Sequence, residues 1–356
     1  MSRLRLSVIG AGSWVVSSHL PQLARRADDV EFFGVCRHGG SLLEKIRGDW
    51  GFSVASEDHR EVLRHGADVV IVASPMALHH EHALAALRAG AHVLVEKPFT
   101  ATSDQARELV AEAERLDRHL LVSYGYNYRP MMVRAKEVIT DLGGIGELEN
   151  VALFMASGTR ELLSGTGSYA RAADTAAPDA ATWTDPRMSG GGYAQAQLTH
   201  AIGLAEWLQP LGVQSVQALA ASPLGGPVEQ HNAAVLRLEH GGIGTITGAS
   251  AHALAMDHRD QLQIRAVGSA GQFTLDVDGD RFRMYRTGRE EIDITFPDGS
   301  GRYECDGPPH ALVDLALGRP VENRSPGALG LATVAVLEAL YASTAGGVPV
   351  TVRSAR

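Results

Sequence analysis

Glu96, Lys97 and Pro98 are the residues of this chain whose types and spacing point most directly to chemistry. They follow an apolar run at 91–95 that predicts a buried strand, and the proline ends regular strand pairing. Ligands of open α/β sheets bind outside the carboxyl ends of the strands. Lys97 is therefore placed to polarise a bound oxygen atom with its ammonium group.

A second group suited to acid–base chemistry follows three consecutive glycines, on a helix predicted over 193–208. Tyr193, Ala196, Gln197 and His200 recur at helical spacing and share one face of this helix. A neutral histidine can take a proton from a hydroxyl group near neutral pH. A polar face that begins just after three glycines can look into a cleft, so Tyr193 and Gln197 are candidate substrate contacts and His200 is a candidate base.

A glycine-rich turn near the N-terminus predicts a dinucleotide site. It lies between a strand at 4–9 and a helix, and a second strand follows at 30–36. Glycines in this position let the backbone approach a pyrophosphate at a helix N-terminus. Val15 replaces the third glycine of the motif, which serves helix–strand packing, so we expect binding to be retained. The turn residues expected to contact the cofactor are Gly10, Gly12, Ser13 and Trp14.

Arg37 ends the second strand, where NAD-binding proteins usually carry an acidic residue for the ribose hydroxyls. A guanidinium can hold a 2′-phosphate with two hydrogen bonds. We predict that NADP is preferred over NAD, with Arg37 and the adjacent His38 in contact with the cofactor. The open alternative is that Arg37 stacks on the adenine and gives no phosphate preference.

Motifs after later strands carry a family resemblance. S-P-x-x-x-H follows a strand at 68–73, A-G-x-H-V-x-x-E-K-P ends at Pro98, and Y-N-Y-R-P occupies 126–130. With the glycine-rich turn, these motifs resemble the glucose–fructose oxidoreductase / inositol dehydrogenase / rhizopine catabolism (Gfo/Idh/MocA) family. That family comprises NAD(P)-dependent oxidoreductases of sugars and cyclic polyols.

The resemblance implies roles for specific residues and also shows departures. It implies that Lys97 and His200 are catalytic and that both contact the substrate. The family places an aspartate four residues before the histidine, where this chain has Ala196, and often an asparagine where it has Met76. Without the aspartate, His200 is a weaker base, Gln197 or Tyr193 orients it, or the physiological direction is carbonyl reduction. The resemblance adds Ser74, Pro75, His79, Glu96 and Lys97 to the expected cofactor site, and Tyr126 to the substrate site.

The order of predicted elements gives two domains. Strands alternate with helices through residues 1–123, which predicts a six-stranded, doubly wound parallel sheet (a Rossmann domain). Successive strands from 147 onward predict an α+β domain at 124–356 with a large, mostly antiparallel open sheet. Asp260 is expected in a solvated turn before one of these strands, and Ser325 as the cap of a helix at 326–345. Because open sheets must be covered, we expect a homodimer or homotetramer through this sheet.

Composition narrows the class of protein. The 356 residues carry a net charge of −9 without a basic cluster, which argues against a nucleic-acid partner. No apolar run reaches membrane-spanning length, and the N-terminus enters a strand directly. The two cysteines offer no disulfide framework, so we expect a cytoplasmic protein. The 15 histidines are scattered, and we predict no metal site.

The leading functional prediction is an NADP- or NAD-dependent enzyme that interconverts a hydroxyl and a carbonyl group on a polyhydroxylated small molecule, namely a sugar, a sugar derivative or a cyclitol. Three alternatives stay open. Bound NAD could act within one turnover to assist glycoside cleavage, or an imine or unsaturated ring could be reduced. The third is a non-catalytic dinucleotide-binding regulator, suggested by Val15, Met76 and Ala196 together. Specificity is expected to come from the irregular stretch at 158–192 and from the large sheet.

Overall fold

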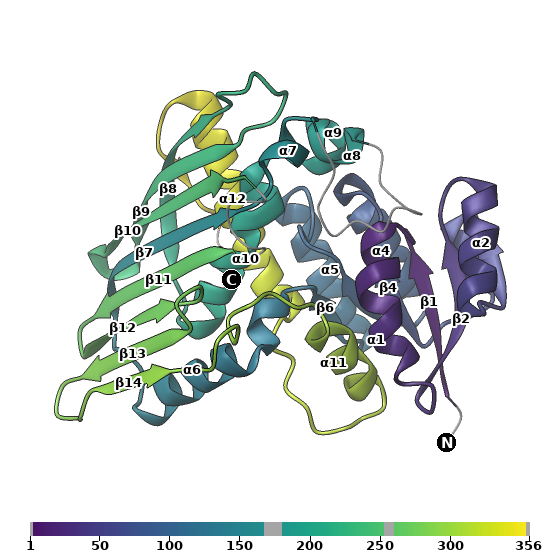
Figure 1. The fold of residues 1–356 in the computed structure, drawn as a ribbon, viewed down its shortest axis with the longest axis horizontal. Helices are drawn as coiled ribbons and strands as arrows, with labels where there is room; N and C mark the ends of the chain where they lie inside the picture. The colour runs from purple at the N-terminus through teal and green to yellow at the C-terminus, as the bar shows by residue number, and fades with distance from the viewer. Residues whose placement is uncertain (1–2, 167–179, 253–259, 354–356) are drawn as a thin grey trace.

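The computed structural model describes residues 3–166, 180–252 and 260–353 and shows two β-sheets side by side, with helices packed on both (Figure 1). The N-terminal sheet lies at one end of the molecule and the larger sheet at the other (Figure 1).

The first sheet has six parallel strands in the order β3-β2-β1-β4-β5-β6, which confirms the predicted doubly wound sheet. Its strands are almost uninterrupted apolar runs because helices cover both faces; all four residues of β4 are fully buried. The strands are β1 (Leu4–Ile9), β2 (Val30–Cys36), β3 (Val54–Ser56), β4 (Val69–Val72), β5 (His92–Val95) and β6 (Leu120–Val122), and the helices are α1 (Leu20–Ala24), α2 (Gly40–Trp50), α3 (His59–Arg64), α4 (His79–Arg88) and α5 (Ser103–Leu116).

The strand order reverses between β1 and β4, and their carboxyl ends meet closely there. Gly10 follows β1 with φ +90°, and a Cβ atom on it would lie 2.2 Å from the backbone nitrogen of Ser74. Only glycine tolerates this approach. Such a reversal point is where open α/β sheets bind their ligands.

The second sheet has nine strands in the order β14-β13-β12-β11-β7-β10-β9-β8-β15. All neighbouring pairs are antiparallel except β7 and β10, so the predicted large, mostly antiparallel sheet is confirmed. The short strand β15 was not predicted. The strands are β7 (Leu148–Ser157), β8 (Val213–Ala221), β9 (His231–Leu238), β10 (Ile243–Ser250), β11 (Gln261–Gly268), β12 (Gly271–Asp276), β13 (Arg281–Arg286), β14 (Ile292–Thr295) and β15 (Val350–Thr351).

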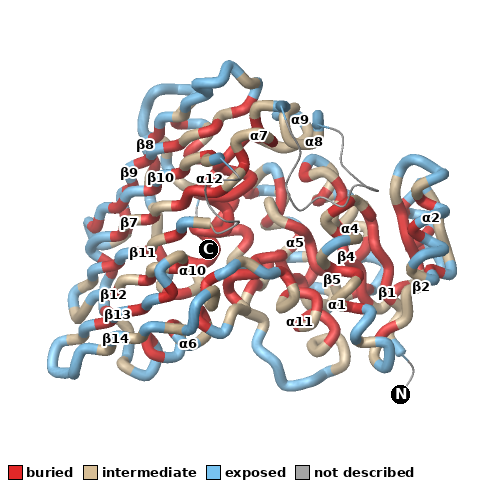
Figure 2. The backbone as a smooth tube through the Cα atoms, in the orientation of Figure 1, coloured by how far each residue is buried: buried red, intermediate tan, exposed pale blue. Residues whose placement is uncertain are grey.

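Three helices cover the inner face of this sheet: α6 (Pro130–Asp141), α10 (Thr199–Leu208) and α12 (Gly327–Gly346). Buried and exposed residues alternate along β9 and β10, so one face of the sheet joins the core and the other faces outward (Figure 2). Contrary to the prediction that no apolar run reaches membrane-spanning length, one of the described helices, α12, is long and apolar enough to span a membrane. Of its most apolar window, 56% is buried inside the structure.

Ser325 does not cap α12, contrary to the prediction. Pro326 occupies the capping position, and no side chain bonds to the free backbone N–H groups there. The Ser325 hydroxyl instead lies 3.0 Å from the hydroxyl of Tyr128. Ser325 lies one residue before the capping position, and its hydroxyl links the start of α12 to the segment after β6.

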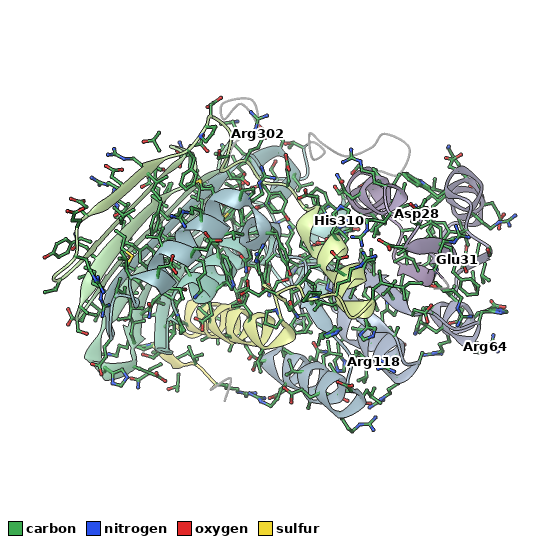
Figure 3. The ribbon with its side chains drawn as sticks, turned by 90° about the horizontal axis from the view of Figure 1, so that it is seen from below. Asp28, Glu31, Arg64, Arg118, Arg302 and His310 are labelled. Carbon is green, nitrogen blue, oxygen red and sulfur yellow. The ribbon has the colours of Figure 1, made fainter. Side chains whose placement is uncertain are left out.

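Helix α11 (Gly307–Ala316) comes after the second sheet in sequence but packs on the first. Leu312 and Val313 share a buried cluster with residues of β1, β4 and β5, and Asp314 pairs with Arg26 at 2.6 Å. Figure 3 shows His310 of this helix on the side of Asp28, in the first half of the chain. The segment from β14 to α11 therefore crosses from one sheet to the other. A domain division at residue 123 stays a prediction.

Candidate active site

Lys97 follows β5 and reaches across to the second half of the chain. Its Nζ donates a hydrogen bond to the backbone oxygen of Ala196 at 3.0 Å. Burial lowers the pKa of Lys97, while the charge of Glu96 and weaker contributions from Cys305 and Asp260 act in the opposite direction. The ammonium group is thus partly desolvated and held in a fixed place, which strengthens its field on a neighbouring oxygen atom.

The backbone oxygen that Lys97 contacts lies in a part of the chain that is not a regular α-helix. Residues Ala194–Leu198 form a π-helical turn (η5) that leads into α10, so the continuous helix predicted over 193–208 is wrong in its first part. The family resemblance implies a carboxylate at position 196. Ala196 has none and contacts Lys97 through its backbone oxygen instead.

Glu229 fixes the start of this π-helical turn. Its carboxylate accepts hydrogen bonds from the backbone nitrogens of Gly192 at 2.7 Å and Ala194 at 3.0 Å, and from the hydroxyl of Tyr341 at 2.7 Å. The carboxylate satisfies backbone donors that a helix start leaves unpaired. It thereby sets the position of the residues that follow, including His200.

His200 lies beside Lys97, so the structure brings the two predicted catalytic groups together. Burial and the positive charge of Lys97 hold the pKa of His200 well below its ordinary value. The ring is therefore neutral at physiological pH and can accept a proton. Its Nδ1 is buried without a hydrogen-bond partner among the described residues, and a buried polar atom of this kind calls for a partner such as a ligand.

Tyr193 does not lie toward the substrate, contrary to the prediction. It is fully buried in the core of the second sheet. Its hydroxyl donates to the backbone oxygen of Met155 at 3.1 Å and accepts from Ser157 at 3.0 Å. The π-helical turn between Tyr193 and His200 breaks the regular spacing on which the shared face was predicted. Gln197 is buried within that turn.

Aromatic rings surround His200. The ring centroid of Tyr126 lies 5.8 Å from that of His200 with its plane at 87°, and Tyr303 lies 4.9 Å away at 62°. Trp14 stacks on Tyr303 at 6.3 Å. Tyr126 and Trp14 were predicted site residues, whereas Tyr303 was missed because it lies in an irregular segment without a motif.

Glu96 joins the glycine-rich turn to the loop that carries Lys97. Its Oε1 lies 3.0 Å from Nε1 of Trp14, which donates to it, and 2.6 Å from Nε2 of His19. Its Oε2 accepts from the backbone nitrogen of Lys97 at 3.1 Å. Burial alone would raise the pKa of Glu96, but the hydrogen bond and charge of His19 and the charge of Lys97 lower it overall. Glu96 is therefore a buried carboxylate that orients its neighbours.

His19, Glu96 and Cys305 are buried with their side-chain N, O and S atoms within 4.8 Å of one another, a grouping that could hold a metal ion. Two ligands of a tetrahedral zinc ion lie roughly 3.3 Å apart, whereas the His19–Glu96 contact of 2.6 Å is a hydrogen bond. Burial, together with Glu96, also raises the pKa of the Cys305 thiol to about 12. These features favour a hydrogen-bonded network.

The cofactor side of the site is built by turns at the strand ends. A Cβ atom added to Gly12 would meet nothing within 4 Å, so the turn has an open side that a pyrophosphate can approach. Arg37 lies beside this turn, because its Nη1 donates to the backbone oxygen of Ala11 at 3.1 Å. His38 is exposed next to it. The predicted residues therefore fit a dinucleotide.

His79 links two of these turns. Its ring nitrogens lie 2.7 Å from the backbone oxygen of Ser74 and 2.8 Å from that of Pro98. Both nitrogens lie against backbone oxygens, so His79 joins the S-P turn to the E-K-P loop. Its contact with the cofactor stays a prediction. Ser74 also bonds through its hydroxyl to His82 at 2.9 Å. Pro75, in the same turn, precedes a 3-10 turn at Met76–Leu78.

Comparison with known families accounts for this arrangement. Residues 4–124 match the oxidoreductase family with an NAD-binding Rossmann fold, and residues 134–274 match the GFO/IDH/MocA C-terminal domain. The chain belongs to the Gfo/Idh/MocA family. The segment with Tyr303 and Cys305 lies beyond the matched residues.

Relatives of this Gfo/Idh/MocA chain include dehydrogenases of sugars and cyclitols. D-glucoside 3-dehydrogenase of Escherichia coli (strain K12) is 34% identical over 148 residues, covering 41% of this chain and 42% of the relative. scyllo-Inositol 2-dehydrogenase (NADP(+)) of Bacillus subtilis (strain 168) is 26% identical over 158 residues, covering 44% and 42%. The chain thus spans less than half the length of these relatives.

Solved structures show the same fold over nearly the whole chain. An inositol dehydrogenase homologue complexed with NAD+, from Azotobacter vinelandii, superposes with a TM-score of 0.80 at 20% identity, covering 98% of this chain and 97% of that one. A levoglucosan dehydrogenase in complex with NADH and levoglucosan gives a TM-score of 0.78 at 18% identity, covering 99% and 100%.

Asp260 takes part in the site, contrary to its predicted place in a solvated turn. It directly precedes β11, and its Oδ2 accepts a hydrogen bond from the Tyr126 hydroxyl at 3.0 Å. Its charge also favours the protonated form of Lys97. No spacing rule could have found this contact, because 134 residues separate the two partners. Part of the predicted specificity stretch at 158–192 lies outside the described residues.

Proposed function

We propose that this Gfo/Idh/MocA chain is an NAD(P)-dependent oxidoreductase that interconverts a secondary alcohol and a ketone, or an aldehyde, on a sugar, a sugar derivative or a cyclitol. The observation that carries the proposal is the neutral, buried His200 beside the Lys97 ammonium, near the carboxyl end of β5. The names of the relatives point to the same class of substrate.

The chemistry divides between the two side chains. A nicotinamide cofactor, when bound, would supply the acceptor for the hydride of the carbinol carbon. His200 accepts the hydroxyl proton, and Lys97 stabilises the negative charge that develops on the oxygen. In the reverse direction, protonated Lys97 or His200 donates the proton to the carbonyl oxygen.

A substrate panel tests this proposal. Sugars, cyclitols and keto-sugars are assayed with NAD and NADP at several pH values, and cofactor absorbance is followed. We expect cofactor reduction by at least one alcohol. Product formation without a net absorbance change, on tightly retained cofactor, would indicate assisted glycoside cleavage. Turnover of imines or enones alone would indicate a reductase, and cofactor binding without any turnover would indicate a regulator.

We also propose that Arg37 gives a preference for NADP, supported by its position beside the glycine-rich turn. A lost charge-assisted phosphate contact costs about 1.5–3 kcal/mol, so Arg37→Ala is expected to raise KM for NADP by about 10-fold to 100-fold and to leave KM for NAD nearly unchanged. Steady-state kinetics with both cofactors measure this. Arg64→Ala, on the surface of α3, is the matched control. A parent enzyme that prefers NAD would contradict the proposal.

We further propose a homodimer or homotetramer through the outer face of the second sheet. Large apolar side chains are exposed on neighbouring strands of that face: Leu219 at 76%, Val235 at 54% and Ile243 at 58%. Apolar groups exposed together on one face mark an interface.

The cytoplasmic location stays a prediction, consistent with two buried, unpaired cysteines.

Charge on this face is expected to break the assembly. Leu219→Asp combined with Val235→Asp places two desolvated carboxylates in the interface, so sedimentation velocity is expected to show monomers where the parent sediments as a dimer or tetramer. Val321→Asp, exposed at 38% outside the sheet, should leave the parent assembly intact. A parent protein that is monomeric at micromolar concentration would rule the interface out.

A further inference from the structure

We propose that Asp260 is a positioning residue that, together with Tyr126, supplies the negative charge which position 196 lacks. The inference rests on the proposed function, because the charge acts on Lys97 and the Tyr126 ring packs against His200. The carboxylate lies directly before β11 of the second sheet and not on the helix that carries His200. It thus acts on Lys97 from another direction than a residue at position 196 would.

The geometry connects Asp260 to His200 through one side chain. Tyr126 lies in a 3-10 turn (η3, Gly125–Tyr128) after β6 and is buried at 1% exposure. Its hydroxyl donates to Asp260 at 3.0 Å, and its ring meets that of His200 nearly at right angles. The hydrogen bond to an ionised acceptor holds the Tyr126 ring in one orientation. That ring in turn packs against the ring of His200.

Three of the described residues, Glu96, Cys305 and Asp260, favour the protonated form of Lys97. The neighbouring His200 ring is neutral. The Cys305 thiol is uncharged below a pKa of about 12, and the Glu96 carboxylate is already engaged by His19 and Trp14. Asp260 is therefore, among the described residues, the carboxylate of the second sheet that acts on Lys97.

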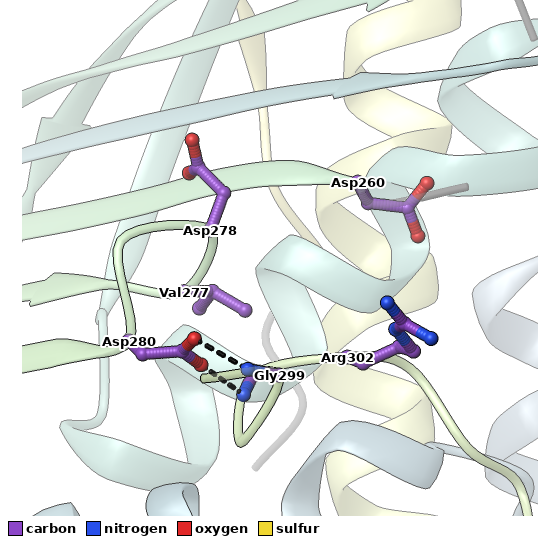
Figure 4. Close-up of a pocket in the computed structure, with 7 residues that line it drawn as sticks. Asp260, Val277, Asp278, Asp280, Gly299 and Arg302 are labelled. Carbon is purple, nitrogen blue, oxygen red and sulfur yellow. Dashed lines mark hydrogen bonds between the residues drawn. The ribbon is translucent and has the colours of Figure 1, made fainter. Parts of the chain in front are cut away.

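Asp260 differs from the acidic residues around it in its hydrogen-bond partner. It lines a small pocket with Asp278, Asp280 and Arg302, and Figure 4 shows the Arg302 side chain on the same side as the Asp260 carboxylate. Asp280 is committed to a turn, because it accepts from the backbone nitrogens of Gly299 and Gly301 at 2.7 Å and 2.6 Å. Asp260 alone among these acids bonds to Tyr126.

The test compares Asp260→Asn, Tyr126→Phe and the double variant. Each single change is expected to lower kcat/KM for the best alcohol substrate about 10-fold to 100-fold, with unchanged cofactor affinity. Because the two residues act as a unit, the double variant should lose no more than either single variant. Loss of the Asp260 charge lowers the pKa of Lys97, so the alkaline limb of the pH profile should move to lower pH.

Asp278→Asn is the matched control, since it removes a carboxylate from the same pocket without touching Tyr126, and its pH profile should equal that of the parent. Thermal unfolding checks that each variant is folded. Should Asp260→Asn fail to fold, Asp260→Glu is expected to restore the parent pH profile while Tyr126→Phe keeps the loss. An unmoved alkaline limb in Asp260→Asn, or additive losses in the double variant, would overturn the inference. A parent without turnover would instead contradict the proposed function.

Discussion

Replacement of Lys97 by alanine is expected to lower kcat/KM for alcohol oxidation by about 1000-fold while the dinucleotide still binds with the parent affinity. A preorganised charge at the reacting oxygen is worth about 100-fold to 1000-fold, and here the same group also anchors the turn that leads to His200. Steady-state kinetics give the rate loss, and fluorescence titration gives the cofactor affinity.

Lys136 offers a matched control for this change. Like Lys97, it is partly desolvated and donates to a backbone oxygen, that of Leu208, at 3.1 Å. It lies on α6, and the alanine variant should keep the parent kcat/KM. Near-parent turnover in Lys97→Ala would show that Lys97 does not stabilise the charge that develops on the reacting oxygen.

His200→Asn is expected to reduce kcat/KM by about 100-fold to 10,000-fold, the usual contribution of a positioned general base. The pH profile carries a further expectation. A base acts in its neutral form, so activity is lost only as pH falls through its pKa. Burial and Lys97 hold the pKa of His200 well below its ordinary value, so the acidic limb of the parent lies below about 6.5.

The acidic limb of the pH profile also links the Lys97→Ala variant to His200. Loss of the Lys97 charge removes one of the two causes that depress the pKa of His200, so the residual activity of Lys97→Ala should show its acidic limb at higher pH. His119→Asn serves as the control, because His119 stacks on His92 at the amino ends of β5 and β6, opposite the site. Parent-like rates in His200→Asn would require another base.

The fold could be predicted well from the sequence because the strands and helices of each sheet show a local pattern of apolar residues. Residues 4–123 alternate buried strands with helices, and the strands from 148 onward alternate inward and outward residues, as the structure shows. Turn glycines mark the ends of these elements. The path of α11 back to the first sheet has no local signal, because it depends on packing against Ile71 and Leu94.

Residues of the site could be predicted only where they belong to a recognisable sequence motif. Lys97 and His200 follow from their motifs, but Asp260 and Tyr303 reach the site from segments without one. His19 meets Glu96 across 77 residues, a distance at which no spacing rule applies. Tyr193 was misplaced because its predicted face assumed regular α-helical spacing through a segment that is π-helical.

A crystal structure with bound NADP or NAD would show whether Lys97 and His200 share one nicotinamide. We expect the nicotinamide ring to lie against both side chains, with its reactive carbon open to the space beside the His200 ring. Electron density that places the nicotinamide away from either side chain, or turns the two groups toward separate cavities, would contradict it.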